Sequence, residues 1–96
     1  LNNRGVLAAR SGDLEAAVKL LIQAVEQVPN LQFLVNAAKA IYTLMDQNGW
    51  DNDLAARALG YLKRAQGKDR KSPKVASARA LYVTVAKKYG VTTELS

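Results

Sequence analysis

The side chains in this sequence that could do chemistry are cations, carboxylates, amides and tyrosines, because histidine and cysteine are both absent. Histidine is the commonest general base and metal ligand, and cysteine supplies thiolates for catalysis and for zinc. Asp46, Asp51 and Asp53 lie close together, but they lack the spacing of a calcium loop, and two of them suit the start of a helix. Ser11 and Ser72 lie at turns with no base nearby in the sequence. We therefore expect no enzyme activity, no cofactor and no metal site.

Positive charge is concentrated in the second half of the chain. The formal charge is +6, and residues 57–88 carry ten basic side chains against one acidic side chain. The densest part is a basic patch made of Lys63, Arg64, Lys68, Arg70, Lys71 and Lys74. Three interpretations stay open for it: a solvated face that stabilises a helix C-terminus, a surface for an acidic protein, or a contact for nucleic acid or anionic lipid. Only Tyr61 is nearby as a stacking platform and no recognition motif accompanies the patch, so the contact with nucleic acid or anionic lipid is the least favoured of the three interpretations.

The composition is typical of one small helical domain. The chain has 96 residues, 49% of them hydrophobic but only 6% aromatic, and Ala, Leu and Val dominate. Alanine is the best helix former and lets helices approach closely. No apolar run approaches the roughly 20 residues of a membrane span, so we expect no membrane contact and a cytoplasmic protein. The chain begins at Leu1 without methionine, and we expect it to be part of a longer protein.

Capping and turn signals predict five helices. Helix starts are indicated at Asp51 or Asp53 and again at Ser72-Pro73. A break is indicated at Asn48-Gly49, and Gly67 is a candidate for a left-handed residue after a helix. The expected helices lie before Ser11, from Asp13 to Val28, from about Gln32 to Gln47, from Asp51 or Asp53 to Gln66, and from Pro73 to Tyr89. Short connections predict that consecutive helices are antiparallel neighbours.

Two segments forty residues apart have nearly the same sequence, "AKAIY" at 38–42 and "ARALY" at 78–82. The following pattern also recurs, since Ala17-x3-Leu21-x2-Ala24 matches Ala58-x3-Leu62-x2-Ala65. In this alternation of small and large residues the chain resembles the tetratricopeptide repeat (TPR) family. The strongest match is "LNNRGVLAARSGDLEAAVKLLIQAVEQVP", through Leu1, Gly5, Gly12, Ala17, Leu21, Ala24 and Pro29. The same stretch departs from the family where Arg4 and Ala8 replace larger apolar residues.

The resemblance implies an all-α fold, a right-handed α-solenoid of antiparallel helix pairs with about two and a half units. It implies a single domain over residues 1–90, with a first repeat at 1–29, an atypical second repeat at 30–67, a capping helix at 73–89 and a tail at 91–96. The second repeat is atypical because its first helix is about one turn longer. The opening "LNNRGVLAARSGDLEAAV" also resembles repeats that follow receiver domains in bacterial response regulators, which implies a role in bacterial signalling.

In the TPR family the first helix of each pair lines a concave groove. The positions of this sequence that match the groove positions are Asn3, Val6, Arg10, Asn36, Lys39, Tyr42, Arg79 and Tyr82. Cations there suit carboxylates, and asparagine suits a peptide backbone. Val6 departs from the polar residue that carboxylate-clamping members have, so their specificity does not transfer. The competing interpretation makes Lys39 and Arg79 solvated cations and places the tyrosines in the space between helices.

These observations predict a protein-protein interaction module that binds a peptide or a partner surface, possibly an acidic one, in a concave groove. One alternative is a structural cap that forms homo-oligomers, a homodimer in the simplest case. Another is a basic adaptor for nucleic acid.

Overall fold

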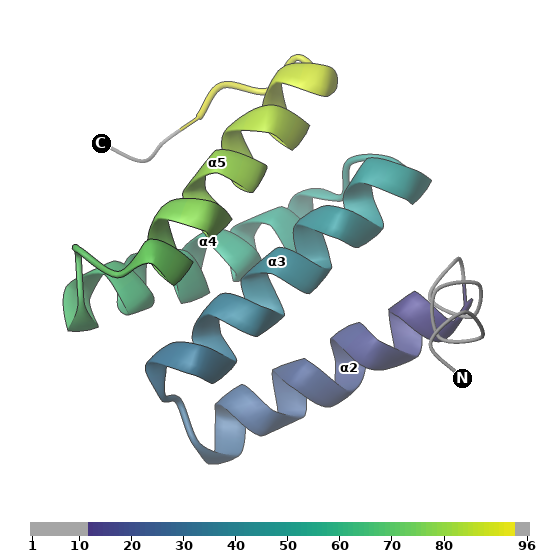
Figure 1. Cartoon of the computed structure of the whole chain (residues 1–96). Coiled ribbons are helices and arrows are strands. Elements are labelled where there is room, and N and C mark those ends of the chain that lie inside the picture. The colour runs from purple at the N-terminus through teal and green to yellow at the C-terminus, as the bar shows by residue number, and fades with distance from the viewer. Residues whose placement is uncertain (1–11, 94–96) are drawn as a thin grey trace, which may run out of the picture.

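The described part of the chain, residues 12–93 of a computed structural model, has regular structure that is entirely α-helical. Its four helices are α2 (Gly12–Gln27), α3 (Leu31–Asn48), α4 (Asn52–Lys68) and α5 (Pro73–Lys88). The chain reverses direction at each short connection, and α3 lies in the middle with the other three helices packed against it (Figure 1). The all-α prediction is confirmed, and the helix expected before Ser11 lies outside the described residues.

The helix ends follow the local capping signals. Asp51 caps α4, where its carboxylate accepts the backbone N–H groups of Asp53 and Leu54 at 2.9 and 3.1 Å. Gly49 ends α3 with φ at 109°, a conformation that costs glycine little. Ser72 precedes α5, and its hydroxyl accepts the N–H of Lys74. The predicted cap at Asp51, the break at Gly49 and the cap at Ser72 are therefore confirmed.

The prediction for Gly67 is wrong, because this residue lies inside α4 and has no positive φ. The helix continues to Lys68, and its end is formed by Asp69 in an extended conformation. The N–H of Asp69 donates to the carbonyl of Ala65, and its carboxylate accepts the N–H of Lys71 at 3.1 Å. An aspartate that bonds its own backbone two residues on makes a turn without a left-handed residue.

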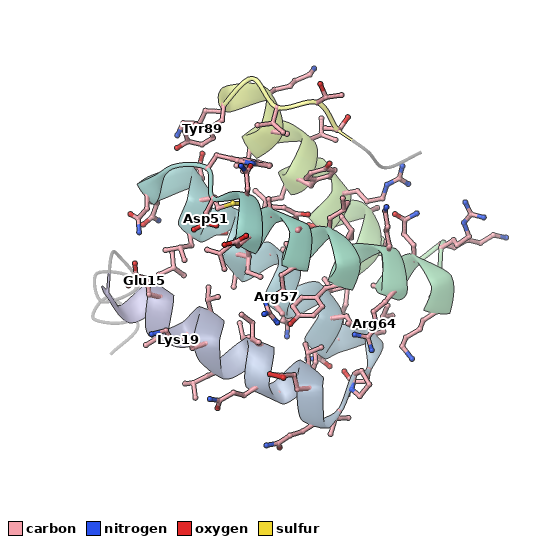
Figure 2. All side chains as sticks on the ribbon, turned by 180° about the vertical axis from the view of Figure 1, so that it is seen from behind. Glu15, Lys19, Asp51, Arg57, Arg64 and Tyr89 are labelled. Atoms are coloured by element: carbon pink, nitrogen blue, oxygen red, sulfur yellow. The ribbon has the colours of Figure 1, made fainter. Side chains whose placement is uncertain are left out.

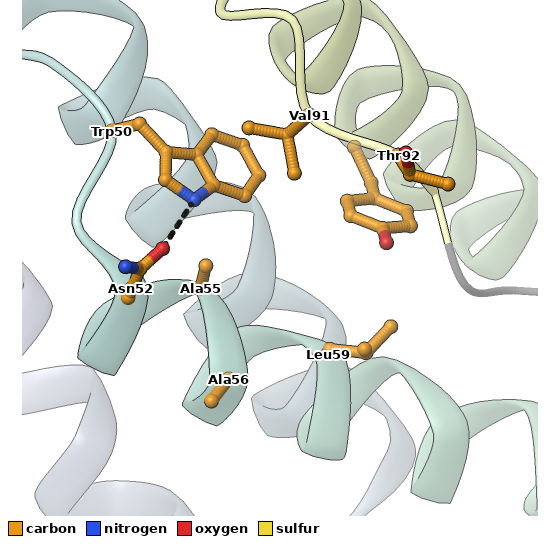
Figure 3. Close-up of a pocket in the computed structure, with 8 residues that line it drawn as sticks. Trp50, Asn52, Ala55, Ala56, Leu59, Val91 and Thr92 are labelled. Atoms are coloured by element: carbon orange, nitrogen blue, oxygen red, sulfur yellow. Dashed lines mark hydrogen bonds between the residues drawn. The ribbon is translucent and has the colours of Figure 1, made fainter.

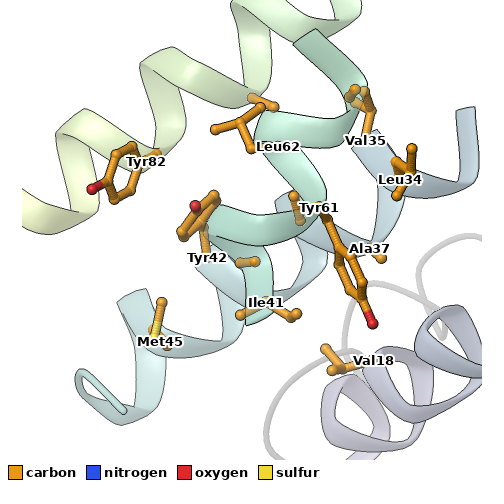
Figure 4. Packing of buried hydrophobic residues seen from close by; sticks show 14 of the residues in the cluster. Val18, Leu34, Val35, Ala37, Ile41, Tyr42, Met45, Tyr61, Leu62 and Tyr82 are labelled. Atoms are coloured by element: carbon orange, nitrogen blue, oxygen red, sulfur yellow. The ribbon is translucent and has the colours of Figure 1, made fainter. Parts of the chain in front are cut away.

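The core is formed around α3, where Leu34, Ile41 and Tyr42 have no exposed surface (Figure 4). Six alanines on α3, α4 and α5 are equally buried, namely Ala37, Ala38, Ala58, Ala65, Ala78 and Ala86. Because these side chains are short, the helices approach closely and the larger residues fill the space beside them. Among the described helices, every one is too short or too polar to span a bilayer.

Replacing Ser72 by alanine should lower the free energy of unfolding by about 0.5–2 kcal/mol. The residue is 6% exposed, and its hydroxyl lies 3.2 Å from the N–H of Lys74, so the variant leaves this donor of the first turn without its cap. Thermal unfolding followed by circular dichroism measures the effect. Ser77→Ala is the control, because Ser77 is exposed inside α5, and it should leave the stability unchanged or raise it. Equal stabilities of the two variants would contradict a capping role.

Candidate functional site

Tyr42 and Tyr82 do not line an exposed groove, which corrects this part of the predicted site. Tyr42 is 0% exposed and Tyr82 is 3% exposed. Their ring centroids lie 5.3 Å apart at 30°, so the two rings pack against each other between α3 and α5 (Figure 4). The reason is the arrangement of the helices: α5 lies along the flank of α3 that carries Tyr42, and it covers that ring. The competing interpretation, in which the tyrosines fill the space between helices, describes the structure.

The Tyr42 hydroxyl has no hydrogen-bond partner among the described residues. Burial, and to a smaller degree the neighbouring Tyr82, raises the pKa of this phenol far above its ordinary value. Tyr42 is therefore a neutral core residue and is not available to a ligand.

The other predicted groove residues of the described part are exposed or half-buried. Asn36 on α3 and Arg79 on α5 are exposed, and Lys39 on α3 is half-buried. Arg79 borders a shallow hollow of about 430 Å³ on α5, together with Ala76, Ala80, Val83 and Thr84. Asn3, Val6 and Arg10 lie outside the described residues. In the described part, the polar residues of the predicted groove are therefore accessible and its aromatic ones are not, and the hollow beside Arg79 includes neither Asn36 nor Lys39.

All six cations of the basic patch are exposed, at the end of α4, in the following turn and at the start of α5. The segment 63–74 has one carboxylate, Asp69, and therefore a net charge of +5. Asp69 uses its carboxylate to accept the backbone N–H of Lys71. The ion pair recorded among residues 12–93 joins Lys88 to Asp46, with 3.0 Å between Nζ and Oδ1. No patch cation is thus neutralised by an ion pair within the described part.

Arg57 belongs to a part of the surface that the sequence reasoning missed. It borders an open hollow of about 660 Å³ on α4, together with Asp53, Ala56, Gly60, Tyr61 and Arg64. The guanidinium Nη1 donates to the Tyr61 hydroxyl at 3.3 Å, and this hydrogen bond raises the pKa of Arg57 further. Figure 2 shows Arg57 and Arg64 on the side of α4 that faces α2. The sequence feature that could have indicated this hollow is Gly60, a glycine in the middle of a strong helical pattern.

Trp50 closes a small crevice between the start of α4 and the segment after α5 (Figure 3). Its indole Nε1 donates to the Asn52 side chain at 3.2 Å, and its ring centroid lies 6.5 Å from that of Tyr89. Val91 also lines the crevice. The volume is about 140 Å³, which is smaller than the roughly 300 Å³ of typical ligand pockets. The Trp50 side chain therefore packs over the turn between α3 and α4 and does not mark a ligand site.

The three neighbouring aspartates have structural partners or lie on the surface. Asp46 pairs with Lys88 and accepts the Tyr89 hydroxyl at its carbonyl, at 2.9 Å, which ties the end of α3 to the end of α5. Asp51 caps α4, and Asp53 is exposed in its first turn. No group of three or more potential metal ligands gathers among residues 12–93.

The comparisons with known proteins give no relative on which to base a family. No family model matches the chain, and searches of curated proteins and of solved structures find no significant match either. The residues and their geometry must therefore carry any statement about function.

Proposed function

We propose that this chain is a protein-protein interaction module with a TPR-like architecture, a right-handed solenoid of about two and a half antiparallel helix pairs. Three features support this architecture. The chain reverses at each connection, α3 packs against α2, α4 and α5, and Ala38 and Ala78 are fully buried at equivalent positions of α3 and α5. Stacked helix pairs of this kind present extended surfaces to partners.

The proposed partner is an acidic segment of another protein. The observation that carries this proposal is the basic patch, whose six cations are exposed and have no ion pair within residues 12–93. Arginine and lysine form charge-assisted hydrogen bonds with carboxylates, and a surface of one sign also speeds the encounter with a partner of the opposite sign. The burial of Tyr42 and Tyr82 removes the aromatic residues of the predicted groove from recognition.

Reversing three patch charges tests this proposal. We expect the variant Lys68→Glu/Arg70→Glu/Lys71→Glu to bind a fluorescent Glu-rich 12-residue peptide at least tenfold more weakly than the wild type at about 0.15 M salt. Exposed ion pairs contribute about 0.2–1 kcal/mol each, and repulsion adds to their loss, so three reversals reach the 1.4 kcal/mol of a tenfold change. Fluorescence anisotropy measures the dissociation constants, and circular dichroism verifies the fold.

The matched control is Lys19→Glu/Lys39→Glu/Arg79→Glu, which changes the net charge equally but lies outside the patch. Wild-type affinity in this control supports the patch, whereas a loss confined to the control moves the site to the predicted groove. Tighter binding of DNA than of peptide, falling steeply with salt, would replace the proposal by the nucleic-acid adaptor. Concentration-dependent dimers in ultracentrifugation, without peptide binding, would favour the homo-oligomerising cap.

A further inference from the structure

The exposed face of α4 carries residues with very short side chains at neighbouring positions. Ala56 and Gly60 lie about one turn apart, both line the hollow of about 660 Å³, and both are exposed. At 3.6 residues per turn, Gly67 lies two turns further on nearly the same line of the helix; it is exposed as well, but it does not line this hollow. The longer side chains of Arg57 and Arg64 border the hollow on the side facing α2 (Figure 2). The result is a shallow channel along α4 between Asp53 and Arg64, with Arg57 and Arg64 on one side.

The packing of the domain does not explain the two exposed glycines of α4, of which Gly60 lines the channel. A Cβ atom at Gly60 or Gly67 would have no atom within 4 Å, and neither residue has a positive φ. Glycine inside a helix lowers stability by roughly 0.5–1 kcal/mol relative to alanine. Two helix-weakening residues therefore lie on one exposed face, where the domain has room for larger side chains. The absent side chains leave space for a chain that is not part of this domain.

The arginines beside the channel are positioned by the fold, and Glu26 on α2 lies near enough to Arg57 to help the Tyr61 hydrogen bond raise its pKa, without forming an ion pair. Arg57 is held by its hydrogen bond to Tyr61, whose ring is buried against the core. Neither Arg57 nor Arg64 has an ion pair among the described residues. They are seven residues apart, which places them two turns or about 10.5 Å apart along the helix. Lys63 and Lys68 add two exposed cations to this helix, and Asp53 is the one carboxylate that lines the hollow.

We propose that this channel is the docking site for an acidic α-helix of a partner protein, with carboxylates about two turns apart that pair with Arg57 and Arg64. The proposal rests on the proposed function as an interaction module and specifies the site and the partner. A helix fits because its own carboxylates at positions i and i+7 repeat the spacing of about 10.5 Å. The short residues at 56 and 60 let its backbone approach α4 closely.

A second copy of this chain does not fit the channel through the same α4 face. Between Asp53 and Lys68, α4 has four cations from Arg57 onward against the single carboxylate of Asp53. Two such faces brought together would place like charges opposite each other, which is destabilising. Charge complementarity therefore selects an acidic partner.

Three helical peptides and one channel-filling variant test the proposal. The probe is an 18-residue Ala/Gln peptide with Glu at positions 6 and 13. In its isomer the second Glu is moved to position 11, about 140° around the helix from the first, and in the third peptide both Glu residues become Lys. We expect the wild-type 96-residue chain to bind the probe at least tenfold more tightly than either comparison peptide. Gly60→Leu should weaken probe binding at least tenfold, because its side chain occupies the channel.

Gly60→Leu keeps this test separate from folding, since leucine is a better helix former than glycine and the melting temperature should not fall. Ala76→Leu is the matched control, because it adds similar bulk on the exposed face of α5 and should bind as the wild type does. Equal binding of probe and isomer, or wild-type affinity in Gly60→Leu, would overturn the docking site. Loss of Glu-rich peptide binding in the patch variant alone would then leave the proposed function standing. Failure of the wild type to bind either acidic peptide would remove both.

Discussion

Tyr42→Ala should lower the free energy of unfolding by about 3–5 kcal/mol, the range for removing a large aromatic side chain from a core. Tyr42 has no exposed surface, and its ring packs against Tyr82 at 5.3 Å between centroids, so truncation leaves a cavity between α3 and α5. Urea unfolding followed by circular dichroism measures the change. A Tyr42→Ala variant that unfolds at the wild-type midpoint would place the ring on the surface instead.

Tyr42→Phe should have the opposite effect and stabilise the domain. The hydroxyl has no partner among the described residues, and a buried polar group without a hydrogen bond costs about 1–3 kcal/mol. The phenylalanine ring keeps the packing and removes this cost. A large loss of stability in Tyr42→Phe would show that the hydroxyl makes a favourable interaction.

The pH dependence of the free energy of unfolding further distinguishes the wild type from Tyr42→Phe. Burial raises the pKa of Tyr42, so the folded state prefers the protonated phenol, and this contribution is fully present below the ordinary tyrosine pKa of about 10. As the pH rises above that value, the unfolded chain ionises first and the contribution is lost. Wild type should therefore lose more stability than Tyr42→Phe between pH 9 and pH 11.

Ala78→Leu should destabilise the domain by about 1–3 kcal/mol, because a well-packed interface cannot accept three additional carbon atoms without displacing its neighbours. Ala78 is 0% exposed on α5, the helix that packs against α3 through Tyr82. The midpoint of urea unfolding measures the change.

Ala80→Leu is the matched control for Ala78→Leu. Ala80 lies two residues away on the exposed side of the same helix, and its replacement should change stability by less than about 0.5 kcal/mol. Comparable losses in the two variants would show that the sensitivity belongs to α5 as a whole and not to a close contact at Ala78.

The positions of α3, α4 and α5 could be predicted closely because their signals are local. Asp51 and Ser72 accept N–H groups two or three residues away, and Gly49 ends α3 through its own backbone conformation. None of these interactions needs a distant part of the chain. Gly67 was the exception, because Asp69, two residues later, formed the turn in an extended conformation, and either residue type can end a helix.

The candidate site was harder to predict, as Tyr42 and Arg57 illustrate. The repeat pattern placed Tyr42 in a groove, but exposure is decided by the helix that lies opposite, and α5 covers it. No sequence pattern singles out Arg57, because its candidate role depends on the hollow that it borders together with Gly60. The exposure of the basic patch is evident from the sequence and from the structure alike, because a loop and two helix ends are exposed in almost any packing arrangement.

The sequence by itself determined the helical class, the boundaries of the later helices and the basic character of the second half. These properties depend on residues within about one turn of each other, or on composition alone. The tertiary structure decided that Tyr42 and Tyr82 are core residues and that Gly60 lies in an open channel beside Arg57 and Arg64. The physical reason is that the exposure of a side chain depends on the neighbouring helices, which come from segments tens of residues away in the chain.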